Sequence, residues 1–119
     1  MAQEEHVSPD GALKLVVARD DDGDITLGFD GYPWHTHGDL LAASYPLADI
    51  SGLTPESATA RFVQDVTGNR AVIAVQRVGA DVRDVWVSAD PAQDLRYRES
   101  DESLQFRYWD GTDVRPPAS

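Results

Sequence analysis

The feature that most constrains the fold is an Asp22-Gly23 pair between two alternating runs of apolar residues. An Asp-Gly pair favours a tight turn with positive φ angles, and such a turn joins two antiparallel strands. Apolar residues occupy every second position on both sides of the turn, namely Leu13, Leu15, Val17, Ile25, Leu27 and Phe29. Alternate side chains of a strand share one face. The sequence therefore predicts a hairpin of residues 13–19 and 24–29 with one face packed inward.

A helix is predicted for residues 55–66. Thr54 suits the N-cap position, Pro55 suits the first turn, and the Glu56 carboxylate complements the helix dipole. Gly68-Asn69 is a typical end signal. Apolar residues gather on one side of this helix, at Ala58, Phe62, Val63 and Val66. We expect the opposite side, with Arg61, Gln64 and Asp65, to face solvent.

The remaining patterns predict two more hairpins and a short helical turn. The hairpins join residues 71–78 to 82–88 and residues 95–99 to 104–109, and the helical turn covers residues 40–44. Together these elements predict an α+β fold with a single antiparallel sheet of about six strands in hairpins and one main helix. We expect one globular domain over residues 1–119, with flexible ends near residues 1–10 and 112–119.

Composition limits the kinds of partner and site. The 119 residues include 21 acidic and 10 basic ones, and the formal net charge of −11 repels nucleic-acid backbones and anionic membranes but attracts basic proteins. The absence of cysteine excludes disulfides, thiolate metal sites and cysteine nucleophiles. No stretch approaches the ~20 apolar residues of a membrane helix, and residues 1–10 lack the apolar run of a signal peptide. We expect a cytoplasmic protein with no nucleic-acid or membrane partner.

Arginine alternates with aromatic residues in Arg96-Tyr97-Arg98 and in Phe106-Arg107-Tyr108-Trp109. Rings between positive charges are typical of surfaces on which nucleic-acid bases stack between phosphate contacts. The acidic balance of the chain argues against that use. We expect instead that Arg107 and the other late arginines lie on the polar face of adjacent strands and pair with Asp84, Glu99 and Glu102.

Residues 29–39 form the one segment with a concentration of chemically versatile side chains. They contain two of the three histidines and one of the three tryptophans. The segment opens the least regular part of the chain, and irregular segments rich in aromatic residues supply the anchors that carry binding energy. The candidate binding residues are Tyr32, Trp34, His35, His37 and Asp39.

His35 and His37 are also the candidates for metal binding or acid/base catalysis. Their spacing points both imidazoles to the same side of an extended strand, where Asp30 and Asp39 offer oxygen ligands. The alternative is structural, with each imidazole bonded to backbone in a loop packed under Trp34. Because two imidazoles and no thiolates are available, we expect no tight metal site in the monomer and no cofactor.

Enzyme motifs are incomplete or missing. His35-Thr36-His37-Gly38-Asp39 resembles the first part of the His-x-His-x-Asp-His motif of the metallo-β-lactamase superfamily, but Leu40 stands where that family has its next histidine. The chain contains neither the Gly-x-Ser-x-Gly motif of hydrolases nor a glycine-rich phosphate loop. These observations disfavour catalysis without excluding a small acid/base enzyme.

The layout resembles that of small uncharacterised bacterial proteins, some of them grouped with immunity proteins of toxin systems. The resemblance rests on Phe-Asp-x-x-Pro-Trp-His-Thr-His at residues 29–37 and on Arg-Tyr-Trp-Asp-Gly at residues 107–111. It implies a protein that blocks a toxin through acidic and aromatic surface groups, without catalysis. We therefore expect a small acidic soluble binding protein that neutralises a basic partner. The alternative is a small metal-dependent or acid/base enzyme centred on His35 and His37.

Overall fold

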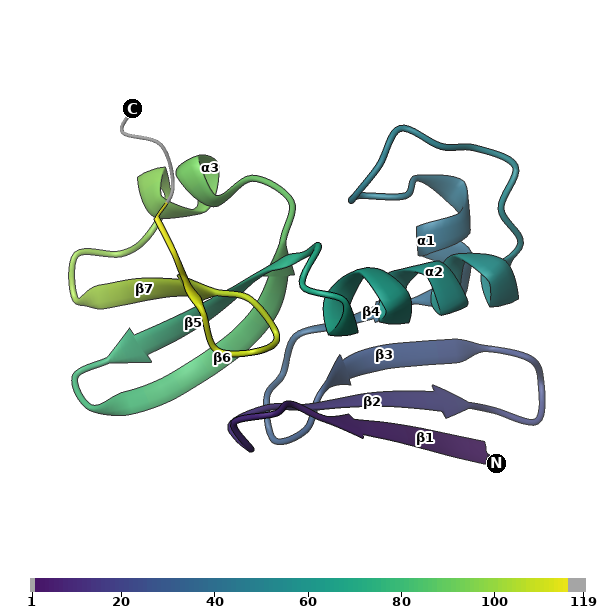
Figure 1. Cartoon of the computed structure of the whole chain (residues 1–119), viewed down its shortest axis with the longest axis horizontal. Coiled ribbons are helices and arrows are strands. Elements are labelled where there is room, and N and C mark those ends of the chain that lie inside the picture. The colour runs from purple at the N-terminus through teal and green to yellow at the C-terminus, as the bar shows by residue number, and fades with distance from the viewer. Residues whose placement is uncertain (1, 116–119) are drawn as a thin grey trace.

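The computed structural model describes residues 2–115, which form an α+β fold with two antiparallel sheets of four strands each (Figure 1). The N-terminal sheet has the order β1-β2-β3-β4, with the strands β1 (Ala2–Val7), β2 (Lys14–Arg19), β3 (Ile25–Phe29) and β4 (His35–His37). The C-terminal sheet has the order β6-β5-β7-β8, with the strands β5 (Val72–Val78), β6 (Asp81–Ser88), β7 (Glu102–Arg107) and β8 (Asp113–Val114). The helices are α1 (Gly38–Ala43), α2 (Pro55–Thr67) and α3 (Pro91–Arg96).

The hairpin β2–β3 forms where the Asp-Gly pair predicts it. Gly23 has a φ angle of +92°, and its N–H donates to the Asp20 carbonyl at 3.0 Å. The strands pair antiparallel from Leu15 opposite Phe29 to Arg19 opposite Ile25. The inward side chains are at most 4% exposed, and they are Leu15, Val17, Ile25, Leu27 and Phe29. The hairpin and its buried face are confirmed.

Helix α2 begins and ends close to the predicted positions. The Thr54 hydroxyl accepts a hydrogen bond from the Ser57 N–H at 3.0 Å, and the Ser57 hydroxyl accepts one from the Thr54 N–H at 2.8 Å. After the helix, Asn69 takes a left-handed conformation with a φ angle of +61°. The predicted apolar side is buried at Ala58, Phe62 and Val66. The main helix is thus confirmed, with a reciprocal cap that fixes its first turn.

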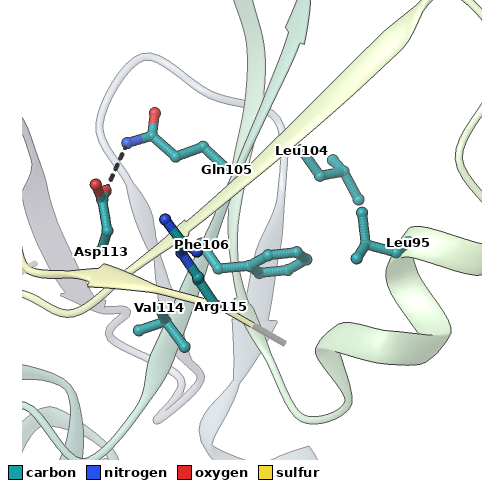
Figure 2. A pocket seen from close by; sticks show the side chains of 7 residues that line it. All are labelled: Leu95, Leu104, Gln105, Phe106, Asp113, Val114 and Arg115. Atoms are coloured by element: carbon teal, nitrogen blue, oxygen red, sulfur yellow. Dashed lines mark hydrogen bonds between the residues drawn. The ribbon is translucent and has the colours of Figure 1, made fainter. Parts of the chain in front are cut away.

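The prediction of one sheet of six strands needs correction, because the strands divide into two sheets. The predicted hairpin β5–β6 forms, but the third one does not. Residues 91–96 are the helix α3, whose N-cap carboxylate, Asp90, accepts from the Gln93 N–H at 3.2 Å. A capping aspartate followed by proline starts a helix, a signal that outweighs the strand pattern of residues 95–99. Leu95 of α3 then faces Leu104 of β7, and β7 pairs with β5 instead (Figure 2).

The two ends of the described chain are also more regular than the sequence predicts. Residues 2–7 form the edge strand β1, which pairs antiparallel with β2. This strand carries charged residues, so it lacks the apolar run by which strands are recognised. Near the other end, β8 pairs with β7. The rest of the predicted flexible C-terminal end, residues 116–119, lies outside the described residues.

A single cluster of buried apolar side chains draws on both sheets. It includes Leu27 from the N-terminal sheet, Phe62 from α2, and Val85 from the C-terminal sheet. Helices α1 and α2 lie beside the N-terminal sheet and contact β3 (Figure 1). The residues of β3 that alternate with the buried ones, such as Thr26 and Gly28, are half-buried and point to the outward face of that sheet.

Candidate functional site

The aromatic segment lies in the turn between β3 and β4, where Tyr32 and Trp34 pack against the buried apolar cluster. Gly31 has a φ angle of +87°, a conformation that side-chain-bearing residues rarely adopt, and the Tyr32 N–H donates to the Phe29 carbonyl at 3.2 Å. The chain then reverses and β4 pairs with β3, with His35 opposite Gly28 and His37 opposite Thr26. Both histidines are thereby placed on the outward side of the sheet.

The two imidazoles lie side by side, as their spacing predicts. Their ring centroids are 5.2 Å apart in an edge-to-face arrangement. His35 Nδ1 lies 3.1 Å from the Pro33 carbonyl oxygen, which gives this ring the backbone contact of the structural alternative. His37 Nδ1 lies 3.3 Å from Thr26 Oγ1 and 3.7 Å from Asp24 Oδ1. His35 is exposed and His37 is half-buried, so His35 is the more available of the pair.

A groove of about 280 Å³ runs along this face beside β4. We call it the β4 groove, and it is lined by Val16, Ala18, Thr26, Gly28, Phe29, Asp30, Gly31, Tyr32, Pro33, Trp34 and His35. Of the predicted binding residues, Tyr32, Trp34 and His35 therefore come together in one groove, whereas His37 and Asp39 do not line it. Asp39 is exposed in the first turn of α1, where its carboxylate accepts from the Leu40 N–H at 3.0 Å.

Gly28 permits the close approach that forms one side of this groove. A Cβ atom at this position would lie 2.9 Å from the Trp34 carbonyl oxygen, closer than real Cβ contacts, and 3.5 Å from the His35 Cβ. The absence of a side chain therefore lets β4 pack tightly against β3.

Trp34 is held in place from two sides. Its ring stacks on Phe29 with a centroid distance of 6.1 Å and an interplanar angle of 29°. Its backbone N–H donates to Asp84 Oδ1 of β6 at 3.0 Å, which ties the aromatic segment to the C-terminal sheet. The indole is half-buried. A rigid, partly exposed aromatic ring is the kind of group that anchors a binding partner at low entropic cost.

The donor set around the histidines does not amount to a metal centre. Within residues 2–115, no group of three or more histidine, cysteine, aspartate or glutamate side chains is placed to hold a metal ion. A protein zinc site needs at least three such ligands.

One buried polar cluster was not predicted from the sequence. Asp65, expected to face solvent, is 3% exposed. Its carboxylate accepts hydrogen bonds from the Tyr45 hydroxyl at 2.6 Å and from the guanidinium groups of Arg61 and Arg70 at 3.1 to 3.2 Å. Burial and the neighbouring Asp65 carboxylate raise the pKa of the Tyr45 hydroxyl. The cluster fastens the loop after α1 to α2, and the Arg61–Asp65 spacing of four residues is the one sequence signal that could have revealed part of it.

Arg107 also departs from its predicted place on a polar sheet face. It is 7% exposed, and its guanidinium donates to both carboxylate oxygens of Asp10 at 2.8 and 3.1 Å. It also donates to the carbonyls of Tyr108 and Trp109. The Arg107 guanidinium and the Ser8 hydroxyl hold the pKa of the Asp10 carboxyl well below its usual range. This pair joins the β1–β2 turn to the C-terminal sheet and is structural.

A second groove, of about 300 Å³, lies between α3 and the strands β7 and β8 (Figure 2). It is lined by Leu95, Leu104, Gln105, Phe106, Asp113, Val114 and Arg115, none of which belongs to the predicted site. Its walls carry no aromatic ring apart from Phe106, which is 3% exposed. The groove offers a ligand little aromatic surface.

Comparisons with protein-family models, with curated proteins and with solved structures find no significant match. None of the helices within residues 2–115 is long and apolar enough to cross a membrane.

Proposed function

We propose that the protein is a small acidic binding module that takes a basic protein partner at the β4 groove. The observation that carries this proposal is that Tyr32, Trp34, His35 and Asp30 line one groove. The chain around this groove has a formal net charge of −11. Aromatic surface and negative charge are the two features that recognise lysine and arginine side chains.

Each feature of the groove has a role in this recognition. The aliphatic stem of a lysine or arginine packs against the rings of Tyr32 and Trp34, and its charged head reaches the Asp30 carboxylate. The net charge attracts a basic protein from a distance and so speeds association, most strongly at low salt. Trp34 supplies the desolvated anchor on which affinity depends. The layout resembles that of small uncharacterised bacterial proteins, some of them grouped with immunity proteins of toxin systems, and this resemblance favours a toxin as the basic partner.

The proposal is tested with a tetra-arginine peptide followed in amide NMR spectra of the protein. We expect shifts concentrated at residues 28–35 and binding that weakens several-fold in Asp30→Asn. Asp101→Asn is the matched control, because Asp101 is exposed, does not line the groove and has the same charge. That variant should weaken binding only slightly. Trp34→Ala should weaken it most.

Three outcomes contradict the proposal in whole or in part. Equal losses in Asp30→Asn and Asp101→Asn would mean that the peptide senses only net charge. Shifts spread over the whole acidic surface would lead to the same conclusion. Salt-independent association of a basic partner recovered by affinity capture would remove the electrostatic part of the argument.

The paired imidazoles favour one second candidate, a small acid/base enzyme. The Asp24 carboxylate lies beside the His37 imidazole, the His37 ring lies against the His35 ring, and His35 lines the groove. In this arrangement the carboxylate can orient His37, and His35 can act as the acid or base toward a bound substrate. Hydrolysis of an activated ester such as p-nitrophenyl acetate, lost in His35→Gln, would favour this enzyme. Rates equal in His35→Gln and in the unmodified protein would favour the binding module.

A further inference from the structure

We propose that a recessed cavity between the two sheets binds a small organic monocarboxylate, with the Arg77 guanidinium as its principal contact. The cavity has a volume of about 160 Å³. It lies between the C-terminal sheet and the loops at one end of the N-terminal sheet, and it is distinct from the β4 groove. We call it the inter-sheet cavity.

One end of this cavity is cationic. Arg77, Gln105 and Arg107 line it, and the register of the sheet places them on a single face, with Val75 opposite Gln105 and Ile73 opposite Arg107. Arg107 is already neutralised by Asp10. The charge of Arg77 is not neutralised in this way, because no carboxylate within residues 2–115 forms an ion pair with it.

Burial sets Arg77 apart from other arginines of the described chain that lack a carboxylate partner. Arg83, Arg96, Arg98 and Arg115 are exposed to solvent, whereas Arg77 is half-buried. A guanidinium that is partly removed from water gains most from a carboxylate, whose two oxygens match its planar donors. The inter-sheet cavity thus presents a positive group with unused hydrogen-bonding capacity inside a strongly acidic protein.

Gln105 is the positioning residue for this guanidinium. Its side-chain oxygen accepts from Arg77 Nη2 at 3.5 Å, and its amide nitrogen donates to Asp113 Oδ1 at 3.1 Å. Figure 2 shows the Gln105–Asp113 bond, which fixes the direction of the amide. With its oxygen directed to Arg77, Gln105 holds one edge of the guanidinium. The remaining N–H groups of Arg77 stay available to a ligand.

The other walls define the body of the ligand. They are formed by the apolar side chains of Leu13, Val75 and Val85, which are at most 6% exposed. Tyr32 borders the cavity from the β3–β4 turn. A volume of this size is below the ~300 Å³ at which pockets for drug-sized ligands begin. The ligand that fits is a carboxylate with a compact apolar body, such as one aromatic ring or a short aliphatic chain.

Benzoate is the probe, and benzamide is its neutral counterpart of nearly equal shape. We expect benzoate to shift the amide NMR signals of residues around the cavity in a saturable manner, with a dissociation constant at or below about 1 mM. Benzamide, which lacks the charge, should cause no saturable shift. Benzoate should also raise the thermal midpoint of unfolding, because a ligand of the folded state stabilises it.

Two variants of Arg77 and one control variant of Arg98 locate the contact. Arg77→Met should weaken benzoate binding at least about tenfold, the loss expected for a charge-assisted hydrogen bond. Arg77→Lys keeps the charge but not the planar donors, and it should give an intermediate loss. Arg98→Met removes the same charge at an exposed position of the chain and should change binding by less than about twofold. Tyr32 is left unchanged because it also lines the β4 groove.

Each other result overturns the proposal. No saturable shift with benzoate, or an equal response to benzamide, would show that the cavity does not select a carboxylate. Equal losses in Arg77→Met and Arg98→Met would reduce the effect to net charge. Inorganic phosphate binding as tightly as benzoate would show that the apolar walls contribute nothing. The peptide test at the β4 groove is independent of all these outcomes.

Discussion

Replacement of Phe62 by alanine tests whether one core holds both sheets together. Phe62 is 1% exposed and belongs to the cluster that includes Leu27 of the N-terminal sheet and Val85 of the C-terminal sheet. Removal of a fully buried phenyl ring costs ~3–5 kcal/mol, because apolar burial is lost and a cavity remains. The total free energy of unfolding of a domain this small is ~5–15 kcal/mol. Phe62→Ala should therefore remove a large share of the stability.

The assay is urea unfolding followed by tryptophan fluorescence and by far-ultraviolet circular dichroism. Both probes should report one transition in the unmodified protein, since the two sheets share the core. Gln64→Ala is the control on the same helix, because Gln64 is exposed and its replacement should change stability by no more than ~0.5 kcal/mol. A loss below ~1 kcal/mol in Phe62→Ala, or two separate transitions in the unmodified protein, would refute the reasoning.

Three further predictions concern the polar clusters and the histidines. Asp10→Asn should lower the free energy of unfolding at neutral pH, and its difference from the unmodified protein should shrink in acid. Arg107 lowers the pKa of the Asp10 carboxyl below the unfolded value of ~3.9. The stabilisation is therefore lost as the pH falls and the carboxylate is protonated. A difference in urea unfolding that does not change with pH would contradict this prediction. Tyr45→Phe should cost ~1–3 kcal/mol in the same assay, because buried Asp65 loses a donor, and an unchanged stability would argue against that role. After dialysis against a mild chelator, elemental analysis should find no stoichiometric zinc, since the β4 histidine pair supplies only two ligands; retained zinc would point to a shared site at a symmetric dimer interface.

The elements predicted correctly from the sequence are those specified by neighbouring residues. The Asp22-Gly23 turn and the cap at Thr54 each act within a few positions, so the hairpin β2–β3 and the helix α2 follow from local chemistry. The proximity of Tyr32, Trp34 and His35 has the same local cause. These residues are close in sequence, and the β3–β4 turn together with the first residue of β4 places them in one groove.

The features that escaped prediction depend on distant partners. Asp65 is a charged residue of the kind found at solvent-facing helix positions. Its burial is compensated by hydrogen bonds from Tyr45 and Arg70, which lie outside its own helical turn. Strand β1 is recognisable only by its pairing with β2, because its own residues are charged. The inter-sheet cavity is lined by residues from both halves of the chain and forms only when they pack together. No local sequence pattern around Arg77 therefore predicts that this residue contacts a ligand.

The ion pair of Asp10 with Arg107 also bears on the kinetics of folding. Its partners are separated by 97 residues, whereas β1 to β4 pair in the order of the sequence. Contacts of short sequence separation, such as those among the strands β1 to β4, close small loops and form early in folding. A contact such as Asp10–Arg107 closes a long loop, and it forms only when the N-terminal and C-terminal sheets come together. An interaction made after the folding transition state slows unfolding and leaves the folding rate nearly unchanged. We therefore expect this pair to act as a latch, which prolongs the lifetime of the folded molecule without hastening its formation.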